Sequence, residues 1–366
     1  MSAEHSVGAV ADQTWTSQAW DAYVRAHPKA TYLQVEPWAR VKASTGWSPA
    51  LVGNPSTAAG PIGARLLTRP IPMLPWRFAY APRGPLANEW NEVTNAAWLD
   101  ALRSEARPGG ALARTAIVRM DPEIEAGPEI EAALRAIGWR PAHDMQPRRT
   151  RIVDLTADED ALLSDLRKKW RQYVNKARSN EIVIRDVDPT VETTAFDVFY
   201  AVMREVSKRT ALPLRSAATF REVWEAYAPT GESRLLFAEN GNGEVQAVLL
   251  TVRCGTRVVE PYGGMTEAGA ESRANYLLKW EAIRSSKEQG ATSYDMWGLI
   301  GSGIDHFKAG FGGREVEYIG AWDLALSPVG ATAFRAAERG RQLYRAARRG
   351  LRGENLALPQ GPAADA

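Results

Sequence analysis

The sequence contains one cysteine, Cys254, and only four histidines among its 366 residues. A single cysteine cannot form a disulfide within the chain or a zinc site of several thiolates, and the histidines show no helical metal-pair spacing. There is no apolar run of about 18 residues that would cross a bilayer, and no signal-peptide pattern at the N-terminus. We therefore expect a cytoplasmic protein without a bound metal, with any membrane contact peripheral and on the cytoplasmic face.

Glycine-rich segments are present, but none has the pattern of a nucleotide-binding loop. The segments 301–303 and 310–313 lack the lysine and serine or threonine of a P-loop. A Gly-x-Ser-x-Gly elbow is missing, and so is a strand-to-helix glycine loop of the kind that holds the pyrophosphate of NAD or coenzyme A. These absences disfavour serine hydrolysis, dinucleotide redox chemistry and acyl-CoA-dependent N-acyl transfer, and we expect no cofactor.

What the chain does contain is an ordinary globular composition, with 45% apolar residues, 24% charged residues and a net charge of +2. A chain of this length makes about two domains at roughly 150 residues each. Its charge is uneven, because residues 335–352 hold seven arginines against one acid and residues 167–178 hold six basic residues and no acid. Such blocks mark either a solvated face or a surface for a polyanion. The six are Arg167, Lys168, Lys169, Arg171, Lys176 and Arg178.

Hydrophobic periodicity predicts a mixed α/β chain. It indicates helices near residues 14–26, 92–106, 128–137, 195–208, 217–226 and 275–289, and strands at 51–52, 64–67, 77–80, 115–120, 235–239, 245–252 and 257–262. Thr156 followed by Glu159 fits a capping box. It predicts a helix whose apolar stripe runs from Leu162 to Ala177, with the basic residues off that stripe.

The two halves of the chain repeat the same order of elements. In each half, strands end at a tyrosine and glycine, a helix and a Gly-Ala pair follow, and a further strand delivers an aspartate, Asp121 or Asp295. This order predicts a duplicated α/β unit. Because clefts between domains are common binding places, we expect the ligand sites near the junction.

Five short motifs between Trp15 and Trp322 resemble those of the FemA/FemB/FemX family, which transfers amino acids from aminoacyl-tRNA to the stem peptide of peptidoglycan precursors. They are 38–42 with Gly46-Trp47, 80–85, 119–122, 294–298 and 307–312. The resemblance implies an α/β (α+β) fold of two tandem GNAT-like domains, with residues 1–150 and about 317–350 in the first, 151–316 in the second and a flexible tail at 351–366. The charged coiled-coil arm of some members has no counterpart between residues 151 and 330.

The resemblance also implies roles for single residues. Lys42 and Arg215 match positions that bind the diphosphate of the precursor, and two cations from different segments hold an anion better than one. Tyr262 matches a tyrosine of the peptide channel, and we add Arg83 and Trp38, from two of the motifs, to the substrate-binding set.

For the chemistry we choose Lys308, because an amine that attacks an ester produces an oxyanion and a lysine ammonium can stabilise it. Phe307 is expected to pack on the terminal adenosine of the tRNA. Asp121 resembles a carboxylate considered as a general base, with a structural role as its alternative, and Asp295 is assigned to structure.

The expected partners are aminoacyl-tRNA, held by the basic residues of 167–178 or by the C-terminal arginines, and lipid II or UDP-MurNAc-pentapeptide as acceptor. The arginine-rich segment 332–351 is alternatively a contact with an anionic membrane surface. We expect a monomer. Two alternatives stay open: the same tRNA-dependent amide formation on a soluble peptide or nucleoside antibiotic intermediate, and a non-catalytic protein that binds tRNA or the precursor.

Overall fold

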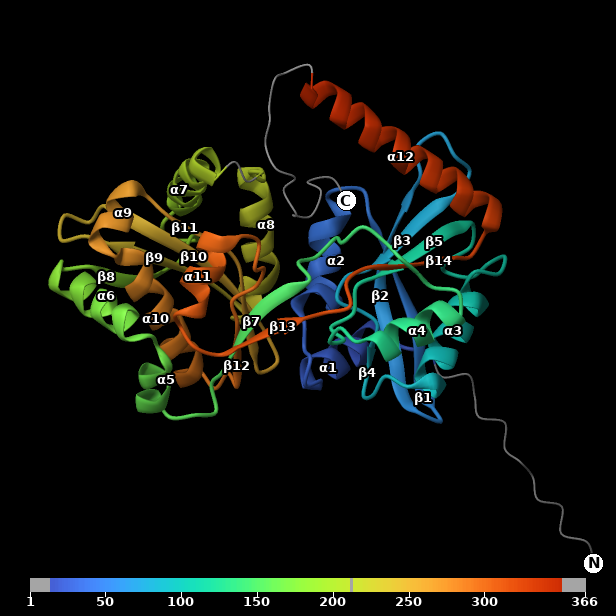
Figure 1. The fold of residues 1–366 in the computed structure, drawn as a ribbon, viewed down its shortest axis with the longest axis horizontal. Coiled ribbons are helices and arrows are strands. Elements are labelled where there is room, and N and C mark those ends of the chain that lie inside the picture. Colours follow the sequence, from blue (N-terminus) through green and yellow to red (C-terminus); the bar gives the residue numbers. More distant parts are fainter. Residues whose placement is uncertain (1–13, 211–212, 351–366) are drawn as a thin grey trace, which may run out of the picture.

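The computed structural model describes residues 14–210 and 213–350. Its two halves lie side by side, and each is built on a mixed seven-stranded sheet (Figure 1). The first sheet has the order β1-β2-β3-β5-β14-β6, with β4 paired to β2. Its strands are β1 (Ser48–Thr57), β2 (Gly60–Pro70), β3 (Arg77–Ala81), β4 (Leu86–Ala87), β5 (Thr115–Met120), β6 (Arg140–Pro141) and β14 (Trp322–Ala325).

The second sheet has the order β13-β7-β12-β11-β10-β9-β8. Its strands are β7 (Arg149–Asp154), β8 (Val183–Val187), β9 (Ser233–Glu239), β10 (Val245–Cys254), β11 (Arg257–Met265), β12 (Ser293–Asp295) and β13 (Arg314–Glu317). The chain leaves this sheet after β13, and its next strand, β14, lies between β5 and β6 of the first sheet. The first sheet therefore contains a strand from the far end of the sequence.

Both sheets repeat one arrangement. An antiparallel meander of three strands ends in a strand that pairs in parallel with the next strand of the sheet, β3 with β5 and β11 with β12. A helical connection crosses over in each case, and an antiparallel strand follows on the other side, β14 or β7. This repeat is the duplicated α/β unit that the sequence predicted.

Helices cover the faces of the sheets (Figure 1). Those of the first half are α1 (Ser17–Ala26), α2 (Glu36–Ala43), α3 (Glu92–Glu105), α4 (Pro128–Ala136) and α12 (Pro328–Gly350). Those of the second half are α5 (Glu159–Asp165), α6 (Lys168–Ser179), α7 (Ala195–Thr210), α8 (Ala217–Tyr227), α9 (Glu267–Ser272), α10 (Ala274–Glu288) and α11 (Ser302–Ala309). Two short 3₁₀ turns lie at Tyr32–Gln34 and Ala228–Thr230. Among the described helices none is long and apolar enough to cross a membrane.

The single helix predicted from the capping box is wrong. The chain forms two helices, α5 and α6, because Leu166 and Arg167 adopt extended backbone angles between them. Asp158 caps α5 by accepting from the N–H of Ala161, whereas the Thr156 hydroxyl donates back to Asp154. An aspartate two residues further on therefore takes the capping position.

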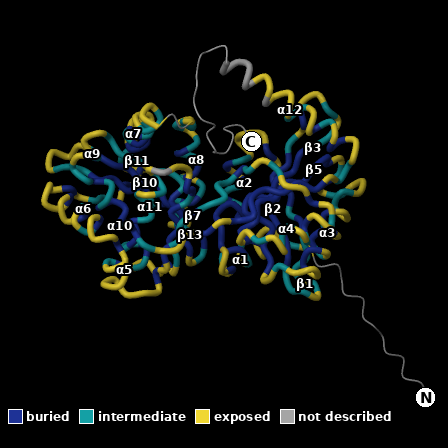
Figure 2. Tube along the Cα trace, viewed as in Figure 1, coloured by how far each residue is buried: buried dark blue, intermediate teal, exposed yellow. Residues whose placement is uncertain are grey.

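The junction between the halves is apolar and buried, as the dark tubes in the centre of Figure 2 show. One core cluster contains Trp20, Tyr32 and Val35 from the first half and Phe199, Phe220 and Val248 from the second. Because such interiors are close-packed and resist deformation, this junction holds the two halves in a fixed relation.

Candidate active site

Lys308 lies on the short helix α11, with its side chain half-buried beneath the loop that follows β12. Its Nζ atom donates hydrogen bonds to the carbonyl oxygens of Trp297 and Gly298, both at 2.8 Å. An ammonium group has three N–H donors. With two of them fixed by backbone carbonyls, the direction of the third is defined by the tetrahedral geometry of the nitrogen.

Trp297 holds its carbonyl toward Lys308 with an uncommon backbone conformation. Its φ is 55°, in the left-handed region that a bulky side chain rarely adopts. The carboxylate of Asp295 accepts from the Trp297 N–H at 2.8 Å. Asp295 is itself held by the hydroxyl of Thr150 and the guanidinium of Arg257. A buried carboxylate with three donors thus fixes the loop that orients the lysine.

Burial lowers the pKa of Lys308 to about 8, because the charged form loses hydration. The carboxylate of Glu260 acts in the opposite direction and favours the ammonium, while the nearby Lys279 opposes it. Glu260 and Lys279 form a buried ion pair, and the Tyr294 hydroxyl donates to the same carboxylate at 2.7 Å. Near neutral pH the lysine is therefore protonated and able to stabilise a negative charge.

A row of aromatic rings leads from Lys308 across the junction. The ring of Trp297 lies 6.0 Å from that of Tyr32, and Tyr32 lies 5.5 Å from Trp38 on α2. Trp38 in turn lies under the ammonium of Lys42, 5.8 Å from its ring centroid. The row joins the predicted catalytic lysine to the predicted phosphate-binding lysine through side chains of both halves.

Lys42 is part of a cluster of three cations. Burial, together with the neighbouring charges of Arg215 and Arg69, lowers the pKa of Lys42 to about 8. Arg69, at the end of β2, stacks on Trp47 with its Cζ atom 4.4 Å from the ring centroid, and Lys42 lies 5.9 Å from the same ring. Glu222 is the carboxylate that favours the ammonium of Lys42. Because neighbouring cations destabilise the charged form of this lysine, a bound anion would be held strongly here.

The structure thus brings Lys42 and Arg215 together, and it adds Arg69, which the sequence analysis missed. Arg215 also lies over the ring of Tyr262, 5.9 Å from its centroid. The indole N–H of Trp38 is buried without a hydrogen-bond partner among the described residues. An unpaired buried donor next to a cation cluster supplies a further group for a polar substrate.

Two predicted site residues, Asp121 and Arg83, make several contacts inside the fold. Asp121 is buried, and it accepts hydrogen bonds from the Tyr80 hydroxyl at 2.6 Å and from the backbone N–H of Arg83 at 2.7 Å. Burial raises its pKa to about 6, although both donors favour the carboxylate. These contacts support the structural alternative for Asp121, as a clamp on the turn at Arg83, and its catalytic role stays a prediction.

Arg83 is also buried, with its guanidinium between the rings of Trp297 and Tyr318 at 5.0 and 4.9 Å. It donates to the carbonyl of Pro147 at 2.6 Å and lies 3.6 Å from Glu123. These contacts make Arg83 a brace between the first half and the Trp297 loop, and its substrate-binding role stays a prediction.

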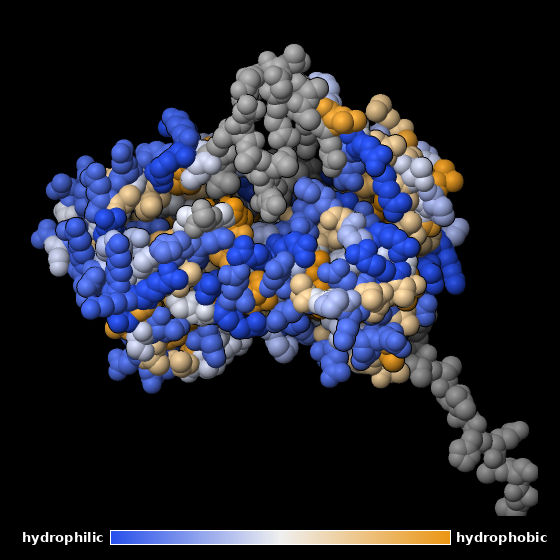
Figure 3. Space-filling view, viewed as in Figure 1, coloured by the Kyte–Doolittle hydropathy of each residue, from blue (hydrophilic) through white to orange (hydrophobic). Residues whose placement is uncertain are grey.

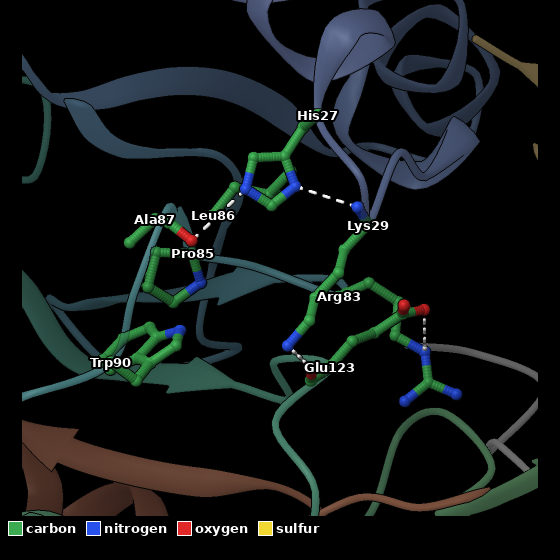
Figure 4. A pocket seen from close by; sticks show the side chains of 8 residues that line it. All are labelled: His27, Lys29, Arg83, Pro85, Leu86, Ala87, Trp90 and Glu123. Carbon is green, nitrogen blue, oxygen red and sulfur yellow. Dashed lines mark hydrogen bonds and ion pairs between the residues drawn. The ribbon is translucent and has the colours of Figure 1, made fainter. Parts of the chain in front are cut away.

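Arg83 also lines a small hollow, together with His27, Lys29 and Glu123 (Figure 4). Lys29 spans it by donating to the backbone carbonyl of Glu123 at 2.8 Å, and burial lowers the pKa of Lys29 and of His27. Neither Lys308 nor Lys42 lines this hollow. The hollow is therefore separate from the candidate active site.

Phe307 packs in an aromatic cluster next to Lys308, 5.1 Å from Tyr276 and 5.2 Å from Phe311. Its backbone carbonyl accepts from the indole of Trp170 at 2.9 Å, which joins α11 to the basic helix α6. A side chain at Gly310 would meet the Trp170 ring at 2.1 Å, so glycine is required for this close approach.

The six basic residues around α6 differ in their contacts. Arg171 donates to the carbonyls of Ser164 and Leu166, and Arg178 forms a 3.0 Å ion pair with Glu281. Arg178 is exposed, as are the other four, Arg167, Lys168, Lys169 and Lys176. Of the C-terminal arginines, Arg352 and the side chains of Arg345, Arg348 and Arg349 lie outside the described residues.

Comparison with family models gives two matches. Residues 15–127 match the FemAB family, and residues 164–309 match the acetyltransferase (GNAT) domain. The first match contains Lys42 and Arg69, and the second contains Arg215 and Lys308.

Curated relatives include the lipid II:glycine glycyltransferases of Staphylococcus saprophyticus subsp. saprophyticus and Staphylococcus aureus. They are 27% identical over 239 residues and 26% identical over 236 residues, which is 61% of this chain and 54% of each relative. The chain thus spans about half the length of the curated relatives it matches.

Among solved structures, the crystal structure of FemX aligns over 86% of this chain and 96% of its own, with a TM-score of 0.74 and 19% identity. A similarity at this identity shows the fold. Together with the GNAT match, it confirms the predicted fold class of two tandem GNAT-like domains.

Proposed function

We propose, on the premise that the chain is related to the FemAB family as its motifs predicted, that it transfers an amino acid from charged tRNA to an amine of a peptidoglycan precursor. The observation that carries this proposal is the Lys308 ammonium, oriented by the carbonyls of Trp297 and Gly298 at the junction of the two halves. The curated relatives act on lipid II by their names, which supports a lipid-linked acceptor.

The cation cluster supplies the acceptor site in this proposal. Lys42, Arg69 and Arg215 hold the diphosphate of the precursor, and the Trp38 indole donates to one of its polar groups. The stem peptide then follows the aromatic row past Tyr262 and Tyr32 toward Lys308. Three cations from three segments restrict both position and orientation, and positioning two reactants is itself a large part of catalysis.

The reaction needs no external source of free energy, because the aminoacyl ester is already activated. The acceptor amine forms a C–N bond with the ester carbonyl carbon, and the carbonyl electron pair moves to oxygen. The third N–H of Lys308 donates to this oxyanion. When the intermediate collapses, the C–O bond to the tRNA ribose breaks, and the ribose oxygen takes up the proton that the amine releases. One well-placed donor of this kind typically contributes about 2.7–4 kcal/mol.

The donor tRNA is assigned to the surface formed by α6 and α11. The exposed cations Arg167, Lys168, Lys169 and Lys176 contact its phosphates, and Phe307 packs on the terminal adenosine. This assignment places the ester next to Lys308, because Trp170 joins α6 to the backbone of Phe307.

The decisive experiment incubates the full chain with lipid-linked, nucleotide-linked and soluble amine acceptors and a set of charged tRNAs. Peptide extension that ribonuclease abolishes, and that Lys308→Ala reduces at least 100-fold, is the expected result. Extension of soluble acceptors alone would favour the antibiotic-intermediate alternative. Binding of tRNA and precursor without extension by any charged tRNA would favour the non-catalytic alternative.

A further inference from the structure

The loop Ile71–Trp76 between β2 and β3 has an apolar tip that the fold does not use. Met73 at its tip is fully exposed, and Pro72 and Pro75 on either side are exposed as well. The backbone at Met73 is left-handed, with φ 62°. One exposed apolar residue is common on a protein surface, so the loop gains weight only together with the exposed apolar residues of its neighbour, helix α12.

Helix α12 packs on β5 and β14 of the first sheet, and its first turn lies beside this loop (Figure 1). A side chain at Gly330 would meet the ring of Trp76 at 3.0 Å, and Phe334 stacks on Phe78 with centroids 5.0 Å apart. The helix then continues past this contact, and Leu343 and Tyr344 are 66% and 64% exposed. At 1.5 Å per residue they lie about 14 Å further along the helix than Phe334.

The exposed charge on α12 is positive. Arg335, Arg339 and Arg341 are exposed, while the one acid of the helix, Glu338, lies 3.5 Å from Arg119 of the first sheet. Figure 3 shows strongly hydrophilic and apolar side chains next to each other along this edge of the molecule. Apolar side chains between arginines on one surface are typical of proteins that lie on an anionic bilayer.

Loop 71–76 lies close to the cation cluster, which relates this surface to the proposed acceptor site. Arg69 of the cluster precedes Met73 by four residues, so the two lie within about 14 Å of each other. The diphosphate of a lipid-linked precursor lies at the bilayer surface, because it is attached to the lipid. A nucleotide-linked precursor has no such requirement.

We propose that loop 71–76 and the exposed face of α12 dock on an anionic lipid bilayer, and that this docking brings a lipid-linked diphosphate to Lys42, Arg69 and Arg215. The statement about the substrate rests on the proposed function, whereas the docking surface does not. The occupant of the surface is the bilayer, and a nucleic acid is the competing occupant that the experiment distinguishes.

The binding experiment sediments the full chain with phosphatidylglycerol-containing vesicles and with pure phosphatidylcholine vesicles. The wild type is expected to bind the anionic vesicles, and Met73→Asp combined with Leu343→Asp to weaken this binding at least tenfold. Aspartate tolerates the left-handed backbone of position 73, so the first substitution leaves the loop intact. The control is Val191→Asp, because Val191 is 78% exposed in the other half and its replacement is expected to change nothing.

Each outcome of this experiment decides the proposal. Wild-type protein that stays in solution with anionic vesicles, or a double variant that sediments like the wild type, would overturn it. Loss of tRNA binding without loss of vesicle binding in Arg335→Gln with Arg339→Gln would assign the surface to nucleic acid instead. Vesicle binding without any aminoacyl transfer would leave the docking surface standing and reject the proposed function.

A second measurement tests the substrate class. The double variant is expected to lose at least tenfold in kcat/KM on a lipid-linked acceptor in anionic vesicles, with its kcat/KM on a soluble nucleotide-linked acceptor unchanged. Equal losses on both acceptors would mean that the substitutions damage the fold or the active site, and would count against the proposal.

Discussion

The Nζ atom of Lys308 lies 2.8 Å from the carbonyl oxygen of Trp297, a residue whose backbone is left-handed and whose ring contacts Tyr32 and Arg83 of the other half. The lysine is thus oriented by a residue that the opposite domain holds in place. The geometry of the reacting group therefore depends on the docking of the two domains.

This relationship predicts the effect of removing the Trp297 ring. Trp297→Gly keeps the left-handed backbone accessible but loses the ring, and we expect kcat to fall about tenfold with little change in KM, since a reacting group loses its orientation. Trp297→Ala adds a backbone penalty of about 1–2 kcal/mol and is expected to be worse. Steady-state kinetics of both variants measure the split. The control is Arg114→Gly, which replaces another left-handed residue (φ 64°) away from the site and is expected to keep wild-type activity.

The lowered pKa of Lys308 predicts a pH dependence. Because only the ammonium stabilises the oxyanion, kcat is expected to fall as the pH rises through about 8, by about tenfold per pH unit above it. Lys308→Arg keeps its charge at every accessible pH, so its lower kcat should show no such fall. Since Lys42 also has a pKa near 8, Lys42→Arg serves as the control. If that variant abolished the decrease in kcat, the titrating group would be Lys42.

The cation cluster predicts a defect in binding of the acceptor rather than in chemistry. Lys42→Ala, Arg69→Ala and Arg215→Ala are each expected to raise KM for a diphosphate-containing acceptor about tenfold, which corresponds to roughly 1.4 kcal/mol, and to change kcat little. Arg40→Ala on the same helix α2 is the matched control, because Arg40 is exposed and pairs with Glu36. An unchanged KM in Arg69→Ala would remove this residue from the site.

Much of the fold could be predicted from the sequence, because periodicity and turn residues are local. Strands such as β5 and helices such as α3 and α10 begin and end within a few residues of their predicted bounds. The break between α5 and α6 could not, because the apolar stripe continues through it and only the backbone at Leu166 and Arg167 separates the helices.

Only part of the candidate site could be predicted, because sequence patterns are local and the site is formed by distant segments. The family resemblance named Lys308, Lys42 and Arg215, whose roles stay predictions, and no local pattern distinguishes an exposed arginine from a buried one. Arg83, which was predicted to bind substrate, is buried and braces the Trp297 loop. Arg69 was missed because its place in the cluster depends on how β2 lies against α2, a contact between segments distant in sequence.

The buried charges at the junction predict that two glutamates contribute differently to the free energy of unfolding. Glu123 pairs with the buried Arg257 and lies 3.6 Å from the buried Arg83. Glu123→Gln is expected to lower the free energy of unfolding by roughly 3 kcal/mol, because Arg257 then keeps only Asp295 and Arg83 loses this carboxylate. Glu315 pairs with Arg149 at the surface, and Glu315→Gln is expected to cost less than about 1 kcal/mol. Denaturant unfolding of both variants measures this, and equal effects would contradict a junction held by buried charge.

The exposed cations of α6 predict salt-dependent binding of tRNA. Replacement of Lys168, Lys169 and Lys176 together by alanine is expected to weaken binding and to reduce the slope of log affinity against log salt, because fewer counterions are released. Filter binding at several salt concentrations measures the slope. The control is Arg178→Ala, since Arg178 is paired with Glu281. A slope that stays the same in the triple variant would place the tRNA elsewhere.

The late position of β14 has a consequence for synthesis on the ribosome. All strands of the second sheet are made by residue 317, whereas the first sheet still lacks the strand that separates β5 from β6. Domains usually fold in the order of their translation. Here the strands of the second sheet are complete first, and β5 keeps an unpaired edge until residues 322–325 have been made.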